Sequence, residues 1–179
     1  KSSPSAASDG SKNQMCANSG TATLATQSFG EPKKGSILLV MGATASMLWW
    51  PESFCQSLAA GGYRVIRFDH RDTGQSTTVP LGSATYAVED LATDVLAIAD
   101  AYDLPRFHLM GMSLGAYIGQ MLALDARERI ATLTLVSAEP LGWDGPALPH
   151  ISDSFLEHFG ALSHLDWSDR TAVVAFLLE

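Results

Sequence analysis

One serine in this chain stands between two glycines at a spacing that suits nucleophilic chemistry. The segment Gly111-Met112-Ser113-Leu114-Gly115 places one glycine two residues before Ser113 and another two residues after it. A serine that attacks a substrate must project its hydroxyl from a tight, strained turn. A Cβ atom at either flanking position would collide with the adjoining strand or helix. Ser113 is therefore the candidate nucleophile.

The residues around this serine predict the strand and the helix that such a turn joins. Phe107-His108-Leu109-Met110 is a short apolar run, typical of a strand that is buried on both faces. An apolar stretch with small residues at Gly115, Ala116 and Gly119 follows it and predicts a helix. The N–H of Leu114 would then lie in the first helical turn, where the helix dipole stabilises a developing oxyanion. A glycine-rich turn whose serine caps the helix is the alternative interpretation.

The composition describes a single acidic domain of ordinary size. The chain has 179 residues, of which 46% are hydrophobic and 17% charged, and its formal net charge is −8. That length is enough for a sizeable core. Nucleic acids and anionic membranes bind clustered Lys and Arg, so the acidic balance argues against either as a partner. No apolar run approaches the length of a membrane span.

The cysteines and the N-terminus bear on where the protein is found. The N-terminus lacks the apolar region of a signal peptide, although a mature secreted protein would lack it too. Cys16 and Cys55 do not have metal-site spacing, and Cys55 falls within a helical pattern that predicts a small, buried, apolar side chain. We therefore expect a reduced, cytoplasmic setting.

Apolar runs alternate with helical patterns along most of the chain. Residues 1–20 are rich in Ser, Ala, Gly and Asn and predict a flexible tail. Helices are expected after Pro51 and from an N-cap at Thr85 to Asp103. Strands that alternate with helices form a mostly parallel sheet with helices on both faces, so the fold class is α/β. The expected strands are an edge strand at 21–29 and buried strands at 36–41, 63–68, 107–110 and 130–136.

The character of the sequence changes at residue 138. Residues 138–146 lack any apolar period, and two short amphipathic patterns follow at 154–162 and 168–178. We interpret residues 21–137 as the core of the α/β domain. Residues 138–179 are interpreted as the start of a helical lid or cap over the carboxyl end of the sheet, where open α/β folds bind ligands.

Three motifs resemble one known superfamily in their order and spacing. They are Val40-Met41-Gly42-Ala43, the polar loop Asp69-His70-Arg71-Asp72-Thr73-Gly74-Gln75-Ser76, and the serine segment 111–115. Over residues 22–137 the chain is similar to the α/β-hydrolase superfamily, and in particular to the branch of aclacinomycin methylesterases and related small serine esterases. The resemblance implies the α/β-hydrolase fold, with the C-terminal part of that fold absent from these 179 residues.

The resemblance also implies cleavage of a carboxylic ester through an acyl-enzyme on Ser113. Superfamily members build an oxyanion hole from the N–H after the nucleophile and from an N–H of the loop after the third strand. On this sequence these donors are Leu114 and Ala43, with Met112 and Gly42 adjacent to them. A plain tight exit from the strand is the alternative role for Gly42-Ala43. A metal or an organic cofactor is not implied, and the expected partner is a small-molecule ester.

Two tryptophans and five histidines complete the set of candidate residues. Trp49 and Trp50 are candidates for lining an apolar substrate pocket, and a packing role is the equally weighted alternative. The resemblance gives the loop at 69–76 a structural role, so His70 and Asp72 are not expected to act in catalysis. The other histidines are interpreted as core, edge or surface side chains, namely His108, His150, His158 and His164.

The general base of a serine hydrolase is missing from this pattern. The superfamily presents its triad in the chain order Ser, then Asp or Glu, then His. Neither a strand nor a histidine follows the last helical pattern, so we expect the acid and the histidine beyond residue 179 of a longer gene product. The alternatives are a non-catalytic ligand-binding pseudo-hydrolase and one half of a split enzyme that pairs with a C-terminal fragment. Perhydrolysis, lyase chemistry, substrate identity and oligomeric state stay open on this scaffold.

Overall fold

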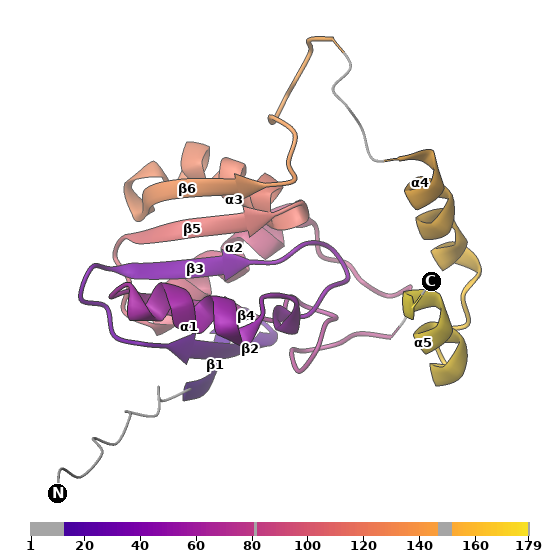
Figure 1. The fold of residues 1–179 in the computed structure, drawn as a ribbon, viewed down its shortest axis with the longest axis horizontal. Helices are drawn as coiled ribbons and strands as arrows, with labels where there is room; N and C mark the ends of the chain where they lie inside the picture. The colour runs from indigo at the N-terminus through magenta and orange to yellow at the C-terminus, as the bar shows by residue number, and fades with distance from the viewer. Residues whose placement is uncertain (1–12, 81, 147–151, 179) are drawn as a thin grey trace, which may run out of the picture. The chain divides into compact units, whose positions relative to one another are not determined.

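The computed structural model describes residues 13–80, 82–146 and 152–178. Within them, a six-stranded sheet has the order β1-β2-β4-β3-β5-β6 (Figure 1). The strands β3 to β6 pair in parallel, whereas β2 is antiparallel to both β1 and β4. The sheet is thus mostly parallel, as predicted. Its strands are β1 (Asn13–Ser19), β2 (Ala22–Phe29), β3 (Ser36–Val40), β4 (Arg64–Phe68), β5 (Phe107–Met112) and β6 (Ile130–Val136).

Helices cover both faces of the sheet. Those of the sheet domain are α1 (Glu52–Ala60), α2 (Val88–Ala101) and α3 (Leu114–Asp125), with short 3₁₀ turns η1 (Met47–Trp49) and η2 (Arg127–Arg129). Figure 1 shows α1 in front of the sheet and α2 and α3 behind it. Successive residues of β3 point to opposite faces, so Leu38 and Val40 join the core under α2 and α3, and Leu39 joins the core under α1. Cys55 is fully buried in the α1 layer, as predicted.

The prediction for the N-terminus was wrong in two respects. Residues 13–19 form β1 rather than a tail, and β2 lies inside the sheet rather than at its edge. A turn at Gly20-Thr21 joins the two strands, and the φ of +56° at Gly20 suits the first turn position of a tight hairpin. Polar and apolar residues do not alternate along β1, so its pairing with β2 left little trace in the sequence. The rest of the predicted tail, residues 1–12, lies outside the described residues.

Two further elements differ from their predictions. The strand β6 was expected to be buried, but Leu135 keeps 43% of its surface exposed because β6 is the edge of the described sheet. The helix α2 begins at Val88 rather than after Thr85. There the Asp90 carboxylate accepts a hydrogen bond from the Ala87 N–H at 2.8 Å, which caps the helix in place of a threonine hydroxyl.

The chain divides into two compact units, and the first extends to Trp143. It passes the predicted boundary at residue 137 because Gln120 of α3 binds the backbone of Glu139 and Leu141. The second unit contains α4 (Asp153–Gly160), η3 (Ala161–His164) and α5 (Arg170–Leu178), which confirms the two helical patterns; its role as a lid stays a prediction. Within the described residues, every helix is too short or too polar to cross a membrane.

Candidate active site

Ser113 stands at the sharp turn between β5 and α3. Its backbone has φ 50° and ψ −116°, a conformation that strains any residue with a Cβ atom. Its N–H donates to the Val136 carbonyl at 2.9 Å, which ties the turn to the end of β6. The serine is exposed and its side chain makes no capping hydrogen bond to α3, so the alternative interpretation as a helix cap was wrong. The hydroxyl is available at the carboxyl edge of the sheet.

The flanking glycines are required by close backbone contacts. A Cβ atom at Gly111 would lie 2.2 Å from the Gly115 carbonyl oxygen. One at Gly115 would lie 2.1 Å from the carbonyl oxygen of Val40, the last residue of β3. Both distances are far below any real Cβ contact, so β3, β5 and α3 meet backbone to backbone at this turn.

Two backbone N–H groups are open beside the serine. Ala116 and Tyr117 donate the first helical hydrogen bonds to the Ser113 carbonyl, which leaves the Leu114 N–H at the free end of α3. A Cβ at Gly42 would lie 3.4 Å from the Ser113 Cβ, so the loop after β3 starts next to the serine, with room for little more than a methyl group between them, and the exposed Ala43 follows. Within the described residues, neither the Leu114 nor the Ala43 N–H has a hydrogen-bond acceptor. These are the two groups that the resemblance implies for an oxyanion hole.

The two candidate pocket tryptophans have different environments. Trp49 is 67% exposed on η1, in the segment that follows Ala43. Trp50 is 7% exposed and stacks on Phe54 of α1 with ring centroids 5.8 Å apart. Packing is therefore the role that the structure gives Trp50, and Trp49 stays a candidate for lining a substrate pocket.

Three of the histidines, His70, His108 and His158, have partners other than Ser113. In the described part of the chain, no side-chain base is hydrogen-bonded to the Ser113 hydroxyl, so the structure pairs this candidate nucleophile with no proton acceptor there. His164 is exposed, and His150 lies outside the described residues. The contacts of the others are His70 Nε2 with the Met41 carbonyl at 3.0 Å, His108 Nδ1 with Thr132 Oγ1 at 2.8 Å, and His158 stacked on Phe176.

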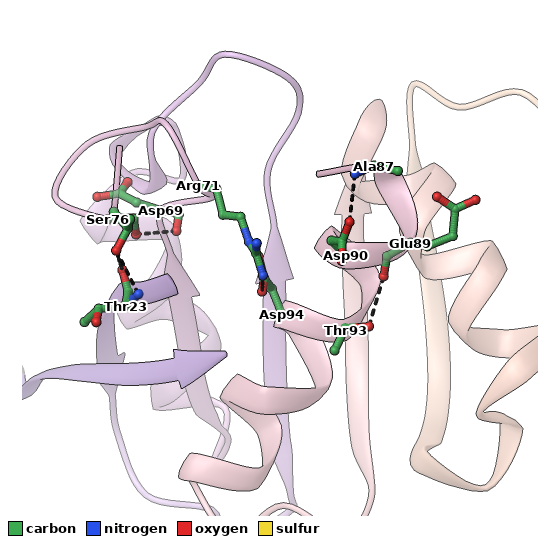
Figure 2. A network of polar contacts seen from close by, with 10 residues as sticks. Thr23, Asp69, Arg71, Ser76, Ala87, Glu89, Asp90, Thr93 and Asp94 are labelled. Atoms are coloured by element: carbon green, nitrogen blue, oxygen red, sulfur yellow. Dashed lines mark hydrogen bonds and ion pairs between the residues drawn. The ribbon is translucent and has the colours of Figure 1, made fainter. Parts of the chain in front are cut away.

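The polar loop after β4 is held by two groups of contacts. Arg71 donates from Nε and Nη2 to the two carboxylate oxygens of Asp94 on α2, each at 2.7 Å, and Figure 2 shows this pair face to face. Asp72 accepts from the Val79 N–H at 2.7 Å and from the Tyr86 hydroxyl at 2.6 Å. Burial and the bond to Asp72 raise the pKa of Tyr86 to about 12, so its hydroxyl remains a donor. His70 and Asp72 thus have structural partners, as the resemblance implies.

Breaking the Arg71–Asp94 pair should destabilise the fold. Asp94 is fully buried and the Arg71 side chain is 16% exposed, so Asp94→Ala leaves a guanidinium without its partner in a site closed to most water. We expect a loss of about 2–4 kcal/mol in the free energy of unfolding. Asp100→Ala is the matched control on the same helix, because the Asp100 side chain is 67% exposed in its pair with Arg129 and should contribute less than about 1 kcal/mol. Urea unfolding of both variants measures the difference, and equal losses would contradict the assignment.

His70 should make stability depend on pH. Burial holds the pKa of His70 below its ordinary value of 6.5, against smaller opposing effects of the Met41 carbonyl, Asp94 and Asp69. The unfolded chain therefore binds a proton that the native imidazole resists. The stability from this difference is complete above pH 6.5 and is lost as the pH falls towards the lowered native pKa. Between about pH 7.5 and pH 5.5, urea unfolding should show a larger fall for the wild type than for the non-titrating His70→Gln; equal falls would contradict a neutral imidazole.

Comparison with known proteins identifies this architecture. A family model described as alpha/beta hydrolase fold matches residues 35–174. The chain belongs to the α/β-hydrolase family. A solved hydrolase from Pseudomonas aeruginosa superimposes with a TM-score of 0.67 at 30% identity, over 91% of this chain and 56% of that one. An epoxide hydrolase from Vigna radiata does so with a TM-score of 0.66 at 20% identity, a likeness that shows the fold alone.

Curated relatives of this α/β-hydrolase include named esterases. Rhodomycin D methylesterase DauP of Streptomyces sp. strain C5 is 45% identical over 122 residues, which cover 68% of this chain and 41% of that protein. A putative carbamate hydrolase, RutD of Variovorax paradoxus, is 41% identical over 111 residues, which cover 62% of this chain and 39% of that protein. The chain thus spans about two fifths of the length of these relatives.

Sequence reasoning missed one set of contacts in this α/β-hydrolase. Asp69 and His70 were assigned to a structural loop, but their partners were not foreseen. The structure places both side chains, which are buried, against the segment that carries Ala43. The available signal was a charged residue and a histidine immediately after an apolar strand, a position where a buried polar side chain needs a fixed partner.

Proposed function

We propose that the protein is a serine hydrolase that cleaves a carboxylic ester through an acyl-enzyme on Ser113. The observation that carries the proposal is the turn at Ser113, with φ 50° and ψ −116° between two glycines at which a Cβ would clash with backbone, while the serine hydroxyl stays exposed and uncapped. Such a conformation costs about 1–3 kcal/mol, and strain of this kind persists where a function depends on it. The two open N–H groups beside the hydroxyl support the same reaction.

In the proposed mechanism the Ser113 Oγ attacks the ester carbonyl carbon while a base accepts the hydroxyl proton. The electron pair of the carbonyl moves onto its oxygen, and the N–H groups of Ala43 and Leu114 stabilise that negative charge. One such donor contributes a factor of about 10²–10³ in kcat. The tetrahedral intermediate expels the alcohol, which takes the proton back from the base, and water then hydrolyses the acyl-enzyme. A histidine oriented by a carboxylate, both expected beyond residue 179, supplies the base.

The relatives favour a particular ester. Two of them are named rhodomycin D methylesterases, at 45% and 43% identity, which supports a methyl ester as the substrate class. The putative carbamate hydrolases favour a second candidate, cleavage of a carbamate by the same serine. A cytoplasmic location belongs to the same proposal, and the free cysteines Cys16 and Cys55 are compatible with it.

A kinetic comparison with the full-length protein tests this function. We expect a burst of p-nitrophenol from p-nitrophenyl acetate, equal to the enzyme concentration, because acylation of Ser113 should release p-nitrophenol faster than water hydrolyses the acyl-enzyme. Methyl benzoate should be hydrolysed faster than methyl N-phenylcarbamate, and the reverse order would favour the carbamate candidate. A folded full-length protein that binds methyl benzoate without hydrolysing either substrate would contradict the proposal and favour the pseudo-hydrolase alternative.

A further inference from the structure

We propose that Asp69 and His70 are positioning residues that hold the Ala43 N–H in place beside Ser113. This inference rests on the proposed function and extends it to two side chains that do not touch the substrate. It concerns residues 41–50, the segment between β3 and α1, which we name the oxyanion loop. Ala43 lies near its start and the 3₁₀ turn η1 near its end.

The first part of the oxyanion loop is strained and has no hydrogen bonds of its own. Thr44 has φ 62°, a left-handed conformation that is a true outlier for a β-branched residue. Within the described residues, no hydrogen bond holds residues 42–45. A strained segment keeps one conformation only when its surroundings determine it. The contacts at its two ends must therefore fix the direction of the Ala43 N–H.

Those contacts come from three residues at the carboxyl end of β4. His70 Nε2 donates to the Met41 carbonyl at 3.0 Å, two residues before Ala43. The Asp69 Oδ1 accepts the Met47 N–H at 2.7 Å, where η1 begins. Arg67 donates from Nη1 to the Trp50 carbonyl, where the loop ends. One strand end thus binds the start, the middle and the end of the loop.

Asp69 is itself held in one orientation. Its second carboxylate oxygen accepts the Gln75 N–H at 2.9 Å, and a Cβ at Gly74 would lie 2.0 Å from that oxygen. The Ser76 hydroxyl donates to the Asp69 carbonyl at 2.7 Å and accepts the Ala25 N–H of β2 at 2.9 Å. Figure 2 shows Asp69 and Ser76 side by side in this network. These hydrogen bonds therefore hold the Asp69 carboxylate, which binds the oxyanion loop, in one position relative to the sheet.

The tautomer of His70 follows from its surroundings. The side chain is buried, and the Met41 carbonyl oxygen can only accept a hydrogen bond. The imidazole therefore carries its hydrogen on Nε2. In the described structure its Nδ1 has no hydrogen-bond partner. The ring edge packs against Phe68, and Asp69 and Asp94 are the carboxylates near it. A neutral imidazole with one donor therefore fits the site.

The expected effect on catalysis follows from the position of the loop relative to Ser113. Gly42 lies next to the serine, since even a Cβ added to it would be only 3.4 Å from the Ser113 Cβ, so a shift at Met41 or Met47 moves the Ala43 N–H relative to the developing oxyanion. A misplacement of about 1 Å lowers a rate by about 10²-fold. The N–H acts mainly on the transition state, so loss of its alignment should lower kcat and leave KM nearly unchanged.

Four variants of the full-length protein test the inference. Asp69→Asn replaces one of two acceptors by a donor, so either the Met47 or the Gln75 N–H loses its partner. His70→Leu removes the donor to Met41, whereas His70→Gln retains an N–H at about the same reach. The matched control is Asp72→Asn, in the same loop, because Asp72 binds Val79 and Tyr86 rather than the oxyanion loop.

With p-nitrophenyl acetate, we expect Asp69→Asn and His70→Leu to lower kcat about 10–100-fold with KM within about twofold. His70→Gln should restore kcat to within about fivefold of the wild type, and Asp72→Asn should leave it unchanged. The inhibition constant of trifluoroacetophenone, whose adduct with serine carries an oxyanion, should rise by the same factor by which kcat falls. Thermal unfolding of each variant establishes that the assay temperature lies below its transition.

Three results would overturn the inference. One is an active wild type whose kcat is unaffected by Asp69→Asn and His70→Leu. The second is a fall in kcat with no rise in the inhibition constant, or a fall in kcat that Asp72→Asn shows as well. Either would be explained by a general loss of stability rather than by misalignment of the Ala43 N–H. The third is a wild type that neither hydrolyses the ester nor binds the inhibitor covalently, which would overturn the proposed function together with this inference.

Discussion

Ser113→Ala is expected to lower kcat for ester hydrolysis by at least about 10⁴-fold, because the oxyanion donors alone retain only a small part of the catalysis. The matched control is Ser137→Ala. Ser137 has the same φ of 50° and follows β6, the neighbour of strand β5, which ends just before Ser113. Steady-state rates with p-nitrophenyl acetate measure both variants. A fall of less than about tenfold in Ser113→Ala would show that another group performs the attack.

The same position should show a conflict between stability and activity. The strained backbone of Ser113 is relieved by glycine, which adopts positive φ without a steric penalty. Ser113→Gly should therefore be inactive and yet more stable to urea than Ser113→Ala, by about 1 kcal/mol. Equal stability of the two variants would mean that the φ of 50° stores no strain.

The second large effect is expected at Gly115. The Cβ atom in Gly115→Ala would lie 2.1 Å from the Val40 carbonyl oxygen, and a backbone atom cannot move aside as a side chain can. We expect a loss of about 3 kcal/mol or more in the free energy of unfolding, together with loss of ester hydrolysis as the turn is displaced. Chemical denaturation and the ester assay measure the two effects on one preparation.

Gly119→Ala is the control for this substitution, one turn further along α3. Its Cβ would lie 2.8 Å from methyl groups of Leu109 and Leu133, which are the far ends of flexible side chains. The higher helix propensity of alanine offsets part of that crowding, so we expect a net change of about 1 kcal/mol or less. A loss in Gly115→Ala no larger than that in Gly119→Ala would contradict the backbone contact between α3 and β3.

The parts of the fold that were predicted correctly are those with a strong local pattern. The apolar runs around Leu38, Ile66 and Leu109 specify buried parallel strands, and the glycines at 111 and 115 specify the tight turn between β5 and α3. Strand β1 was missed because its pairing depends on backbone hydrogen bonds rather than on side-chain type. The burial of β6 was overestimated because an apolar composition does not show which strand forms the edge of a sheet.

For the candidate site, the sequence indicates Ser113, Ala43 and Leu114, whose roles stay a prediction, but it does not indicate the contacts that hold their surroundings in place. Ser113, Ala43 and Leu114 belong to short motifs whose spacing determines their geometry. The contacts of Asp69 with Met47 and of His70 with Met41 join segments more than twenty residues apart, and only the tertiary fold brings them together. Trp50 illustrates the same limit, because a tryptophan next to a site and a tryptophan beneath it have the same sequence signal.

The most direct test of the central claim is the site of reaction with a fluorophosphonate in the folded, full-length protein. The hydroxyl of Ser113 should displace fluoride from phosphorus, and mass spectrometry of the digested protein should find one adduct, on the peptide that contains Ser113. Ser113→Ala should remain unlabelled under the same conditions. An adduct on a different residue, or none at all in a correctly folded sample, would contradict the assignment of Ser113 as the nucleophile.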